Sequence, residues 1–399
     1  MITVEEATQL ILSQTKDFGV ESISWDKSLG RVLAEDIHAD RNFPPFNRVM
    51  MDGIAIRKED FDTGLRKFPV KGLLAAGDPP FELHGSGTCM EIMTGSALPK
   101  SVNCVIPYEQ VTIADGLAHV DRDNVTNMMN VHLEGMDRNK GDLLIASGTE
   151  IGQAEIAILT TVGAVQVLVN QLPRITIVST GDELVDVDQS PLPHQIRKSN
   201  VYALQALCRE FSIEPNVIHI PDSKNEIRKE LQGILDVTDV LLLSGGVSKG
   251  KKDFLPEILE ELGITKSFHR VKQRPGKPFW FGYSEKLTCF AFPGNPASTF
   301  MCSIRYFQPW LQLSLGLGSI EILATLEEDF NFKPDLTYFL QSAVSLDQNG
   351  RLKAIPRTGQ GSGDLANLVD TNAFLEMPRE RDNFEKGQIF RCWPFRKII

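Results

Sequence analysis

Three acidic residues in the second half of the chain come after apolar segments that are predicted to be strands. Glu183 follows the first such segment and Asp222 follows the second. A third segment leads through a glycine-rich stretch to Asp253. In open α/β sheets ligands collect where strands end and helices begin, so these carboxylates are expected to lie near one another. Proteins usually hold Mg²⁺ through hard carboxylate oxygens together with substrate phosphates. The spacing therefore predicts a divalent metal that bridges an anionic substrate.

Small residues at the same junctions would let the backbone approach an anion closely. In LLLSGGVSKGKKD (241–253) the glycines allow peptide N–H groups to surround phosphate oxygens. In FPGNPAST (292–299) an N-cap residue and a proline at the first helical position predict a helix start that offers N–H donors. The junction residues expected to contact substrate are Thr180, Gly181, Ser244, Gly245, Gly246, Gly250, Gly294, Asn295 and Pro296.

Positive charge is concentrated beside these junctions. Residues 245–278 contain eight Lys or Arg and four Asp or Glu, which gives +4 locally in a chain of formal net charge -11. Within this stretch, RPGKP (274–278) places two basic residues around a Pro-Gly turn. A basic rim that faces carboxylates suits an anionic substrate bridged by a metal.

Simpler interpretations remain open for each residue taken alone. Glu183 could be a helix N-terminal carboxylate that stabilises by about 0.3–1 kcal/mol without doing chemistry. Asp253 could be a helix cap only, and by spacing alone Asp52 is interpreted as a turn residue and Asp137 as a solvated loop residue. The histidines are scattered singly, and no Ser or Cys shows a neighbouring base, which weighs against covalent catalysis. Because unusual residues follow all four predicted strands, a functional site is favoured over four unrelated structural turns.

The elements that would position these residues alternate between apolar strands and amphipathic helices over 174–315. This alternation is typical of a parallel sheet covered on both faces. The strands are expected at 175–178, 217–220, 240–243, 279–282 and 288–292. The helices are expected at 200–211, at 226–235, from a cap at Asp253 onward, and as one long helix over 296–315.

The flanking regions differ in character from this α/β region. Thr3 and Glu6 fit a capping box at the start of an N-terminal helix. Short apolar runs over 64–130, broken by Gly, Pro and Asp, predict a small β-rich module, and 316–399 returns to short strands with a hairpin around 347–350. A helix is expected at 155–162 and a strand at 165–169.

Length and composition bound the function class. With 399 residues the chain should form two to four domains at roughly 100–200 residues each. The acidic net charge argues against a general nucleic-acid or anionic-membrane binder. No apolar stretch approaches the ~18 residues of a membrane helix, and the start MITVEEATQL lacks the charge of a signal peptide. Six dispersed cysteines without a CxxC pair predict reduced, mostly buried thiols in a cytoplasmic protein.

Eight segments in order along nearly the whole chain carry a family resemblance. They are PPFNRVMMDGIA (44–55), IMTGSALP (92–99), the NV…G.D…GD frame over 130–142, VSTGDEL (178–184), LSGGVSKGKKD (243–253), RPGKP, FPGNP (292–296), and QGSGDL (360–365) followed by TNAFLEMP. On these motifs the chain resembles the molybdopterin molybdenumtransferases (MoeA-like proteins), which share their fold with the E domain of gephyrin.

The resemblance implies a reaction and a set of site residues. Enzymes of this family take adenylylated molybdopterin and molybdate, release AMP with Mg²⁺, and insert molybdenum into the dithiolene. By motif, the acidic catalytic set is Asp52, Asp137, Glu183, Asp222 and Asp253, of which Glu183, Asp222 and Asp253 would bind metal. Further substrate-binding residues would be Thr94, Ser248, Lys249, Lys272, Arg274, Pro275, Lys277, Pro278 and Ser362, the last in the molybdate-pocket motif.

The resemblance also implies an architecture. An elongated discontinuous domain is expected from 1–46 and 131–168, with a β domain inserted at 47–130. A three-layer α/β domain of the molybdopterin-binding type would cover 169–315, and a C-terminal β-barrel-like domain 316–399. The family's cleft lies between two subunits, so a homodimer is expected in which Asp52 and Asp137 act in trans. The molybdopterin adenylyltransferase is a further expected partner.

The chain departs from the family pattern at several positions. Asn47, Val49, Met50 and Ile54 alter the first motif, His132-Leu133 replaces an Arg pair, Lys249 replaces a Val, and Gln341 stands where an Arg is common. None of these changes removes a carboxylate of the acidic set. Two alternatives remain at this point: an ATP-dependent molybdopterin adenylyltransferase, and a gephyrin-like dimeric scaffold that binds a peptide.

Overall fold

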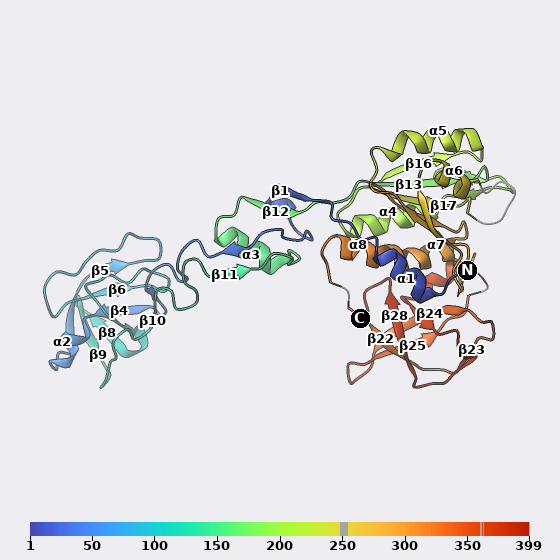
Figure 1. The fold of residues 1–399 in the computed structure, drawn as a ribbon. Coiled ribbons are helices and arrows are strands. Elements are labelled where there is room, and N and C mark those ends of the chain that lie inside the picture. Colours follow the sequence, from blue (N-terminus) through green and yellow to red (C-terminus); the bar gives the residue numbers. More distant parts are fainter. Residues whose placement is uncertain (248–253, 319, 360, 362, 399) are drawn as a thin grey trace.

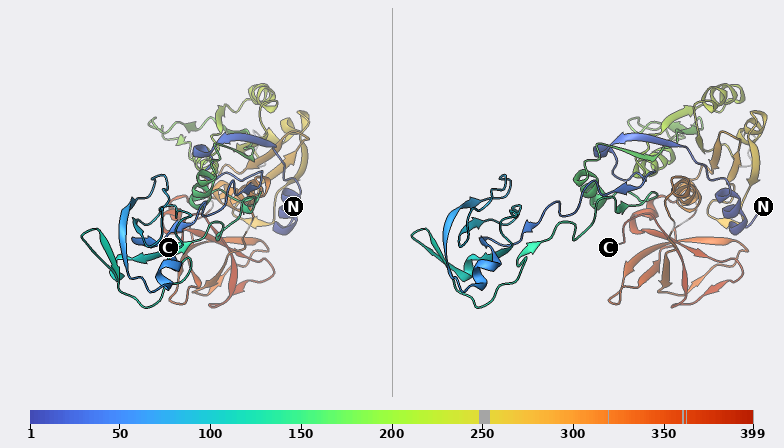
Figure 2. Two further views of the ribbon diagram at one scale, coloured as in Figure 1. Left: turned by 90° about the vertical axis from the view of Figure 1, so that its left-hand side faces the viewer. Right: turned by 60° about the vertical axis from the view of Figure 1, so that its left-hand side comes forward.

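The computed structural model describes residues 1–399 except 248–253, 319, 360, 362 and 399. The molecule is elongated (Figure 1). A β module lies at one end, a thin stalk of two chain segments follows, and an α/β sheet with its helices lies beside a C-terminal β-barrel at the other end. The second view of Figure 2 shows the same separation between the module and the other two parts.

The α/β region is built on a six-stranded sheet with the order β16-β13-β17-β21-β20-β18. Its strands are β13 (Ile175–Thr180), β16 (Asn216–Ile220), β17 (Val240–Ser244), β18 (Thr265–His269), β20 (Trp280–Tyr283) and β21 (Thr288–Phe292). One face packs against α4 (Asn200–Glu210) and α7 (Pro296–Cys302), and the other against α5 (Lys224–Leu235) and α6 (Leu255–Glu261). The three-layer α/β prediction is therefore confirmed.

Three details of this sheet differ from the predictions. The sheet is mixed, because β20 runs antiparallel to β21 and to β18. The short turn between β20 and β21 allows only that direction, since a parallel connection needs a crossover of a dozen or more residues. The strand β18 was not predicted, because its sequence TKSFH contains a single apolar residue, Phe268, and so shows no apolar run. The helix α6 has Phe254 as its N-cap, and the predicted cap Asp253 lies outside the described residues.

The predicted long helix over 296–315 is interrupted. A π-helical turn, Ser303–Phe307, separates α7 from α8 (Gln308–Ser314). Pro309 lies in the first turn of α8 and has no N–H to donate to a carbonyl one turn back. The wider turn just before it accommodates that loss.

The N-terminal helix belongs to the same packing unit. In α1 (Val4–Leu12) the predicted capping box is confirmed: the Glu6 N–H donates to Thr3 Oγ1 at 3.1 Å, and the Thr3 N–H donates to Glu6 Oε2 at 2.8 Å. Its buried face shares a core with the α/β sheet, and the helix lies beside α8 in Figure 1.

The stalk consists of two antiparallel passes of the chain. Three short strand pairs join the outgoing and returning segments. They are β1 (Val20–Ser24) with β12 (Gln166–Asn170), β2 (Ile37–His38) with β11 (Leu143–Ile145), and β3 (Arg48–Val49) with β10 (Val131–His132). The helix α3 (Gln153–Thr161) packs on this narrow core. The stalk therefore holds the module at a distance from the α/β sheet, while the predicted domain boundaries stay predictions.

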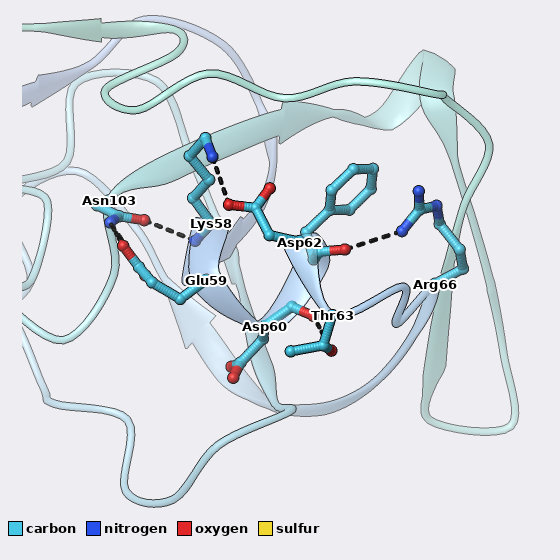
Figure 3. Close-up of polar contacts among 8 residues, drawn as sticks. Lys58, Glu59, Asp60, Asp62, Thr63, Arg66 and Asn103 are labelled. Atoms are coloured by element: carbon cyan, nitrogen blue, oxygen red, sulfur yellow. Dashed lines mark hydrogen bonds and ion pairs between the residues drawn. The ribbon is translucent and has the colours of Figure 1, made fainter.

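The module at the far end contains a six-stranded sheet of order β7-β4-β6-β5-β9-β8. The strands are β4 (Gly53–Ile56), β5 (Lys67–Leu74), β6 (Cys89–Ile92), β7 (Cys104–Pro107), β8 (Val111–Ala114) and β9 (Leu117–Val120). Asn103 fixes the short helix α2 (Lys58–Asp62) to the sheet, because its Oδ1 accepts the Lys58 N–H at 2.7 Å and its Nδ2 donates to Glu59 (Figure 3).

The C-terminal part is a closed five-stranded barrel. Its strands pair in the order β24-β25-β22-β28-β26, and β26 pairs back to β24. They are β22 (Leu323–Leu326), β24 (Thr337–Leu346), β25 (Leu352–Pro356), β26 (Ala373–Met377) and β28 (Ile389–Pro394). A small outlying pair joins β23 (Phe330–Asn331) to β27 (Asn383–Phe384). From the α/β region, β19 (Gln273–Arg274) adds to β24 in parallel and ties the two parts together.

A buried ion pair also joins the barrel to the α/β region. Arg305 Nε lies 3.0 Å from Glu376 Oε2, and the two side chains are only 4% and 9% exposed. The same carboxylate oxygen accepts the Trp393 Nε1–H at 2.8 Å, and the Arg305 guanidinium lies 4.3 Å from the centroid of the Trp393 ring. The charges are thus paired and hydrogen-bonded, as burial requires.

The cysteines agree with the sequence prediction. All six lie within the described residues, and each is buried and unpaired. Burial raises the pKa of the Cys104 thiol to about 11 and that of Cys208 to about 12. Among the described residues, no helix has the length and apolar character needed to cross a membrane.

Replacing Glu376 with Ala should destabilise the protein by about 3–5 kcal/mol, because Arg305 would keep a buried charge without a partner. The measurement is the shift of the thermal unfolding transition by calorimetry. Glu321, which is 55% exposed in its pair with Arg391, provides the matched control, and Glu321→Ala should change stability by less than about 0.5 kcal/mol. Equal effects of the two substitutions would contradict this role of the buried pair.

Candidate active site

The carboxyl ends of four neighbouring parallel strands meet at one edge of the α/β sheet. In register, Thr180 lies beside Ile220, and Ser244 lies between Ser179 and Phe292. A cavity of about 410 Å³ opens at this edge. The predicted residues that line it are Thr180, Gly181, Glu183, Asp222, Ser244, Gly245, Gly246, Pro278, Gly294, Asn295 and Pro296. The structure thus brings all four predicted junctions to one place, and their contact with substrate stays a prediction.

Gly245 and Gly246 form part of the cavity wall at positions where another residue would be strained. Gly245 and Gly246 have φ angles of +97° and +66°, which L side chains rarely adopt. A Cβ on Gly245 would lie 2.9 Å from the Thr180 carbonyl oxygen, and one on Gly294 would lie 3.7 Å from the Gly245 Cα. The backbones of three loops therefore approach closely, as a phosphate cradle requires.

Two of the predicted metal ligands line the cavity. The Glu183 carboxylate folds over Gly181, so that a Cβ on Gly181 would lie 2.8 Å from both of its oxygens. Asp222 comes from the neighbouring loop, where its backbone N–H donates to Asp182 Oδ1 at 3.1 Å and joins the two loops. The third predicted ligand, Asp253, lies outside the described residues, as do Ser248, Lys249, Gly250 and Ser362. Within the described part of the chain, no three His, Cys, Asp or Glu side chains form a group suited to a metal ion.

A small lobe over the cavity was not predicted. It is formed by β14 (Leu184–Val185) and β15 (Ile196–Arg197), and Arg197 and Lys198 from it line the cavity. Lys198 Nζ lies 2.9 Å from Asp186 Oδ1, and this hydrogen bond lowers the pKa of the Asp186 carboxyl. The signal that could have revealed the lobe is the basic pair just before the α4 helix. The other cavity residues missed are Ser179, Leu184, Ile196, Ser199, Asn200, Val201, Val247 and Pro293.

The RPGKP turn contributes only Pro278 to the cavity. Lys272 lies beside the N-terminus, where its N–H donates to the Ile2 carbonyl. Arg274 belongs to β19 and lies 6.0 Å from the centroid of the Phe332 ring, and Lys277 is exposed. The Arg274-Pro275 peptide bond is cis. Among the described residues, the basic side chains that line the cavity are Arg197 and Lys198, and Lys272, Arg274 and Lys277 of the predicted rim do not line it.

The remaining predicted acidic residues gather at the junction of stalk and module. The Asp52 Oδ1 accepts both the N–H and the hydroxyl of Thr94 at 2.7 Å, and these bonds lower the pKa of the Asp52 carboxyl. Asp137 Oδ1 lies 2.8 Å from His132 Nε2, and the Arg48 Nη2 approaches the other ring nitrogen at 3.3 Å. Both carboxylates thus have defined partners, which a simple turn or loop role does not require. In Figure 1 this end of the molecule lies far from the α/β sheet, whose residues line the cavity.

Gln341 is not directed to the cavity. It is 8% exposed on β24, and its side-chain oxygen accepts a hydrogen bond from the Asn367 amide. Its backbone carbonyl accepts the Arg357 N–H at 2.8 Å. The glutamine therefore links β24 to Arg357 and Asn367 on the barrel surface.

Three family models together match nearly all of the chain. Residues 2–163 match the MoeA N-terminal region (domain I and II), and residues 324–395 match the MoeA C-terminal region (domain IV). Between them, residues 176–312 match a domain described as "Probable molybdopterin binding domain", which contains the cavity.

Curated relatives and solved structures agree with these matches. A molybdopterin molybdenumtransferase of Synechocystis sp. is 40% identical and covers 99% of both chains. One from Bacillus subtilis is 30% identical over 97% of this chain and 92% of the relative. The crystal structure of a molybdopterin biosynthesis moeA protein from Pyrococcus horikosii covers 100% of both chains with a TM-score of 0.84 at 28% identity.

The hydrogen bonds from Thr94 generate a prediction for pH dependence. Thr94→Val removes the hydroxyl donor but keeps the backbone N–H, so the pKa of Asp52 should rise part of the way toward its ordinary value. A carboxyl with a lowered folded pKa contributes stability above its unfolded pKa and loses it as the pH falls through the folded pKa. Carboxyl-carbon NMR titration of labelled Asp provides the measurement.

Thr112→Val, at an exposed position on β8, is the control and should leave the Asp52 titration unchanged. If Asp52 titrates identically in the wild type and in Thr94→Val, the hydroxyl contact does not exist in solution.

Proposed function

The chain belongs to the molybdopterin molybdenumtransferase (MoeA) family, and we propose that its α/β cavity binds adenylylated molybdopterin and releases AMP from it. It is a transferase of molybdenum cofactor biosynthesis that inserts molybdenum into molybdopterin. The observation that carries the proposal is the meeting of the glycine cradle with Glu183 and Asp222 in one cavity. The transferase name of the full-length relatives favours this function over the adenylyltransferase and scaffold alternatives.

The cavity suits a phosphoanhydride for electrostatic reasons. The glycine backbone of Gly245 and Gly246 can turn N–H groups toward phosphate oxygens. Arg197 and Lys198 line the same space and add positive charge. Donors that are held in place before the reaction stabilise the charge that develops on the phosphate, and this effect often contributes most of the acceleration.

The residues present also fit a magnesium ion. Mg²⁺ is usually bound by one or two carboxylates together with substrate phosphates rather than by a cage of protein ligands. Glu183 and Asp222 provide two carboxylates at the cavity, and Asp253 follows the glycine stretch in sequence. We propose that these residues would hold the ion. When bound it would neutralise charge on the phosphates of the substrate and on the leaving AMP.

The acidic residues of the module would complete the site from a second copy of the chain. Figures 1 and 2 show that the stalk holds the β module, which contains Asp52, away from the α/β sheet of the same chain. Large apolar side chains are exposed at nearby positions in the sequence, and exposed apolar patches mark interaction surfaces. They are Phe46, Met50, Met51, Leu133, Met136 and Leu143. We propose a homodimer in which Asp52 and Asp137 orient water or substrate at the partner's cavity.

We also propose where the enzyme is located and which enzyme supplies its substrate. The buried, unpaired cysteines support a cytoplasmic location, since oxidising compartments favour disulfides. A molybdopterin adenylyltransferase would supply the adenylylated substrate and is the expected partner in the reaction sequence. No role in binding nucleic acid or membrane is proposed.

Removing a metal-binding carboxylate should abolish most of the activity. With adenylylated molybdopterin, Mg²⁺ and molybdate, AMP release by Glu183→Gln or Asp222→Asn should fall roughly 100-fold or more. The isosteric changes should leave the unfolding transition unaltered. Asp188→Asn, an exposed carboxylate of the same lobe, is the control that should retain activity. Normal AMP release by both site variants would refute the assignment of the cavity.

Mixed dimers test the contribution in trans. When Glu183→Gln and Asp52→Asn chains are combined, one cavity of each mixed dimer pairs an intact Glu183 with an intact Asp52 of the other chain. AMP release should return to about half the wild-type rate per mixed dimer, although each variant alone is inactive. If Asp52 acted within its own chain, every cavity would contain one defect and mixing would restore nothing.

A further inference from the structure

A row of polar side chains crosses the carboxyl edge of the sheet beneath the start of α4. The parallel register places His219 of β16 beside Ser179 of β13, and Ser179 beside Ser244 of β17. Neighbours in parallel register point to the same face of a sheet, so the three side chains form one row. Ser179 and Ser244 are 2% and 4% exposed, and both line the cavity.

The hydrogen bond to Ser244 has a fixed direction. Asn200 Nδ2, at the first turn of α4, lies 2.9 Å from Ser244 Oγ and 2.8 Å from the Gly294 carbonyl oxygen. An amide nitrogen can only donate, so the Ser244 oxygen is the acceptor. The single hydroxyl hydrogen of Ser244 must therefore point away from Asn200, and a ligand in the cavity can receive it.

The direction of the bond to Ser179 depends on the histidine. Ser179 Oγ lies 3.0 Å from His219 Nδ1, and a neutral imidazole carries its hydrogen on only one of its two nitrogens. Burial, followed by the nearby Lys198, lowers the pKa of His219, while Asp186, the Ser179 backbone and Asp222 partly oppose this effect. The ring is therefore neutral near pH 7. With the hydrogen on Nδ1, the ring donates to Ser179, and the Ser179 hydroxyl hydrogen can also be given to a ligand.

We propose that His219 is a positioning residue that fixes the Ser179 hydroxyl as a donor, alongside the Ser244 hydroxyl, toward one tetrahedral oxyanion in the cavity. The inference rests on the proposed function of the cavity. Two hydroxyl donors side by side, with Arg197 and Lys198 on the same cavity, fit the oxygens of a phosphate or of molybdate. The sequence could not reveal the Ser179–His219 pair, because the two residues are forty positions apart and meet only through the pairing of adjacent strands.

Three substitutions of His219 separate positioning from packing. Asn places an amide nitrogen near the position of Nδ1, Gln places it near Nε2, and Phe keeps only the ring. The measurement is the Kd by calorimetry of two probes in turn, AMP and inorganic molybdate. His219→Phe should weaken one of them about tenfold or more, as expected for a lost hydrogen bond to a charged group.

The test compares which substitution of His219 restores binding affinity. His219→Asn should restore the affinity to within about threefold, and His219→Gln should not. Ser179→Ala should show the same loss as His219→Phe, and combining the two should add nothing, because His219 acts through Ser179. Loss of AMP affinity would identify a substrate phosphate as the oxyanion, and loss of molybdate affinity would identify the molybdenum donor.

Several results would overturn the inference. If Ser179→Ala bound both probes with wild-type affinity, the inference would be wrong, even if His219→Phe failed to fold. Equal affinities of His219→Asn and His219→Gln would also overturn it. His119→Phe, at an exposed site on β9, is the matched control and should bind both probes normally. If the wild type bound neither AMP nor molybdate, the proposed function of the cavity would fail first, and the inference with it.

Discussion

The constraint on which the site depends is the in-register pairing of parallel strands. Parallel neighbours lie about 4.8 Å apart, so the loops that follow β16, β13, β17 and β21 must start side by side. This places Glu183 and Asp222 on neighbouring loops and the glycine turns on the next two. Helices bury both faces of the sheet, which leaves its carboxyl edge as the open surface. Glycine is favoured at positions 245 and 246 because both have positive φ angles, and a Cβ on Gly245 would also collide with the Thr180 carbonyl oxygen of the adjoining loop.

The second constraint is the length of the stalk. Three short antiparallel strand pairs hold the module away from the sheet, and the junction at its far end carries two exposed carboxylates, Asp52 and Asp137, amid exposed apolar side chains. A single chain therefore has a cavity at one end and part of the proposed acidic set at the other. In a two-fold dimer whose chains run in opposite directions, the module junction of each chain would lie at the cavity of the other chain. Both cavities would be completed in this way, because a two-fold interface repeats every contact twice. The length of the stalk would then determine whether the acidic residues of one chain reach the cavity of the other.

The sequence predicted the elements with strong local signals. The capping box of α1, the apolar runs of β13, β16, β17 and β21, and the hairpin at 347–350 all have clear patterns of side chains. The predictions failed where tertiary pairing decides, at the direction of β20 and the existence of β18. The barrel-like C-terminal domain that the family resemblance implied is confirmed by the pairing of β26 back to β24. At the site, the junction residues were predicted from their position after strands. The lobe and the Ser179–His219 pair were not, since they depend on contacts between segments that lie apart in the sequence.

The most direct measurement is a crystal structure of the protein with AMP, molybdate and Mn²⁺ in place of Mg²⁺. The account predicts AMP phosphate against the Gly245-Gly246 turn, and an anomalous Mn²⁺ signal within about 2.0–2.3 Å of oxygens from Glu183 or Asp222. It also predicts that Asp52 of a second chain faces the same cavity. A metal ion bound by neither carboxylate, or AMP bound away from the carboxyl edge of the sheet, would contradict it.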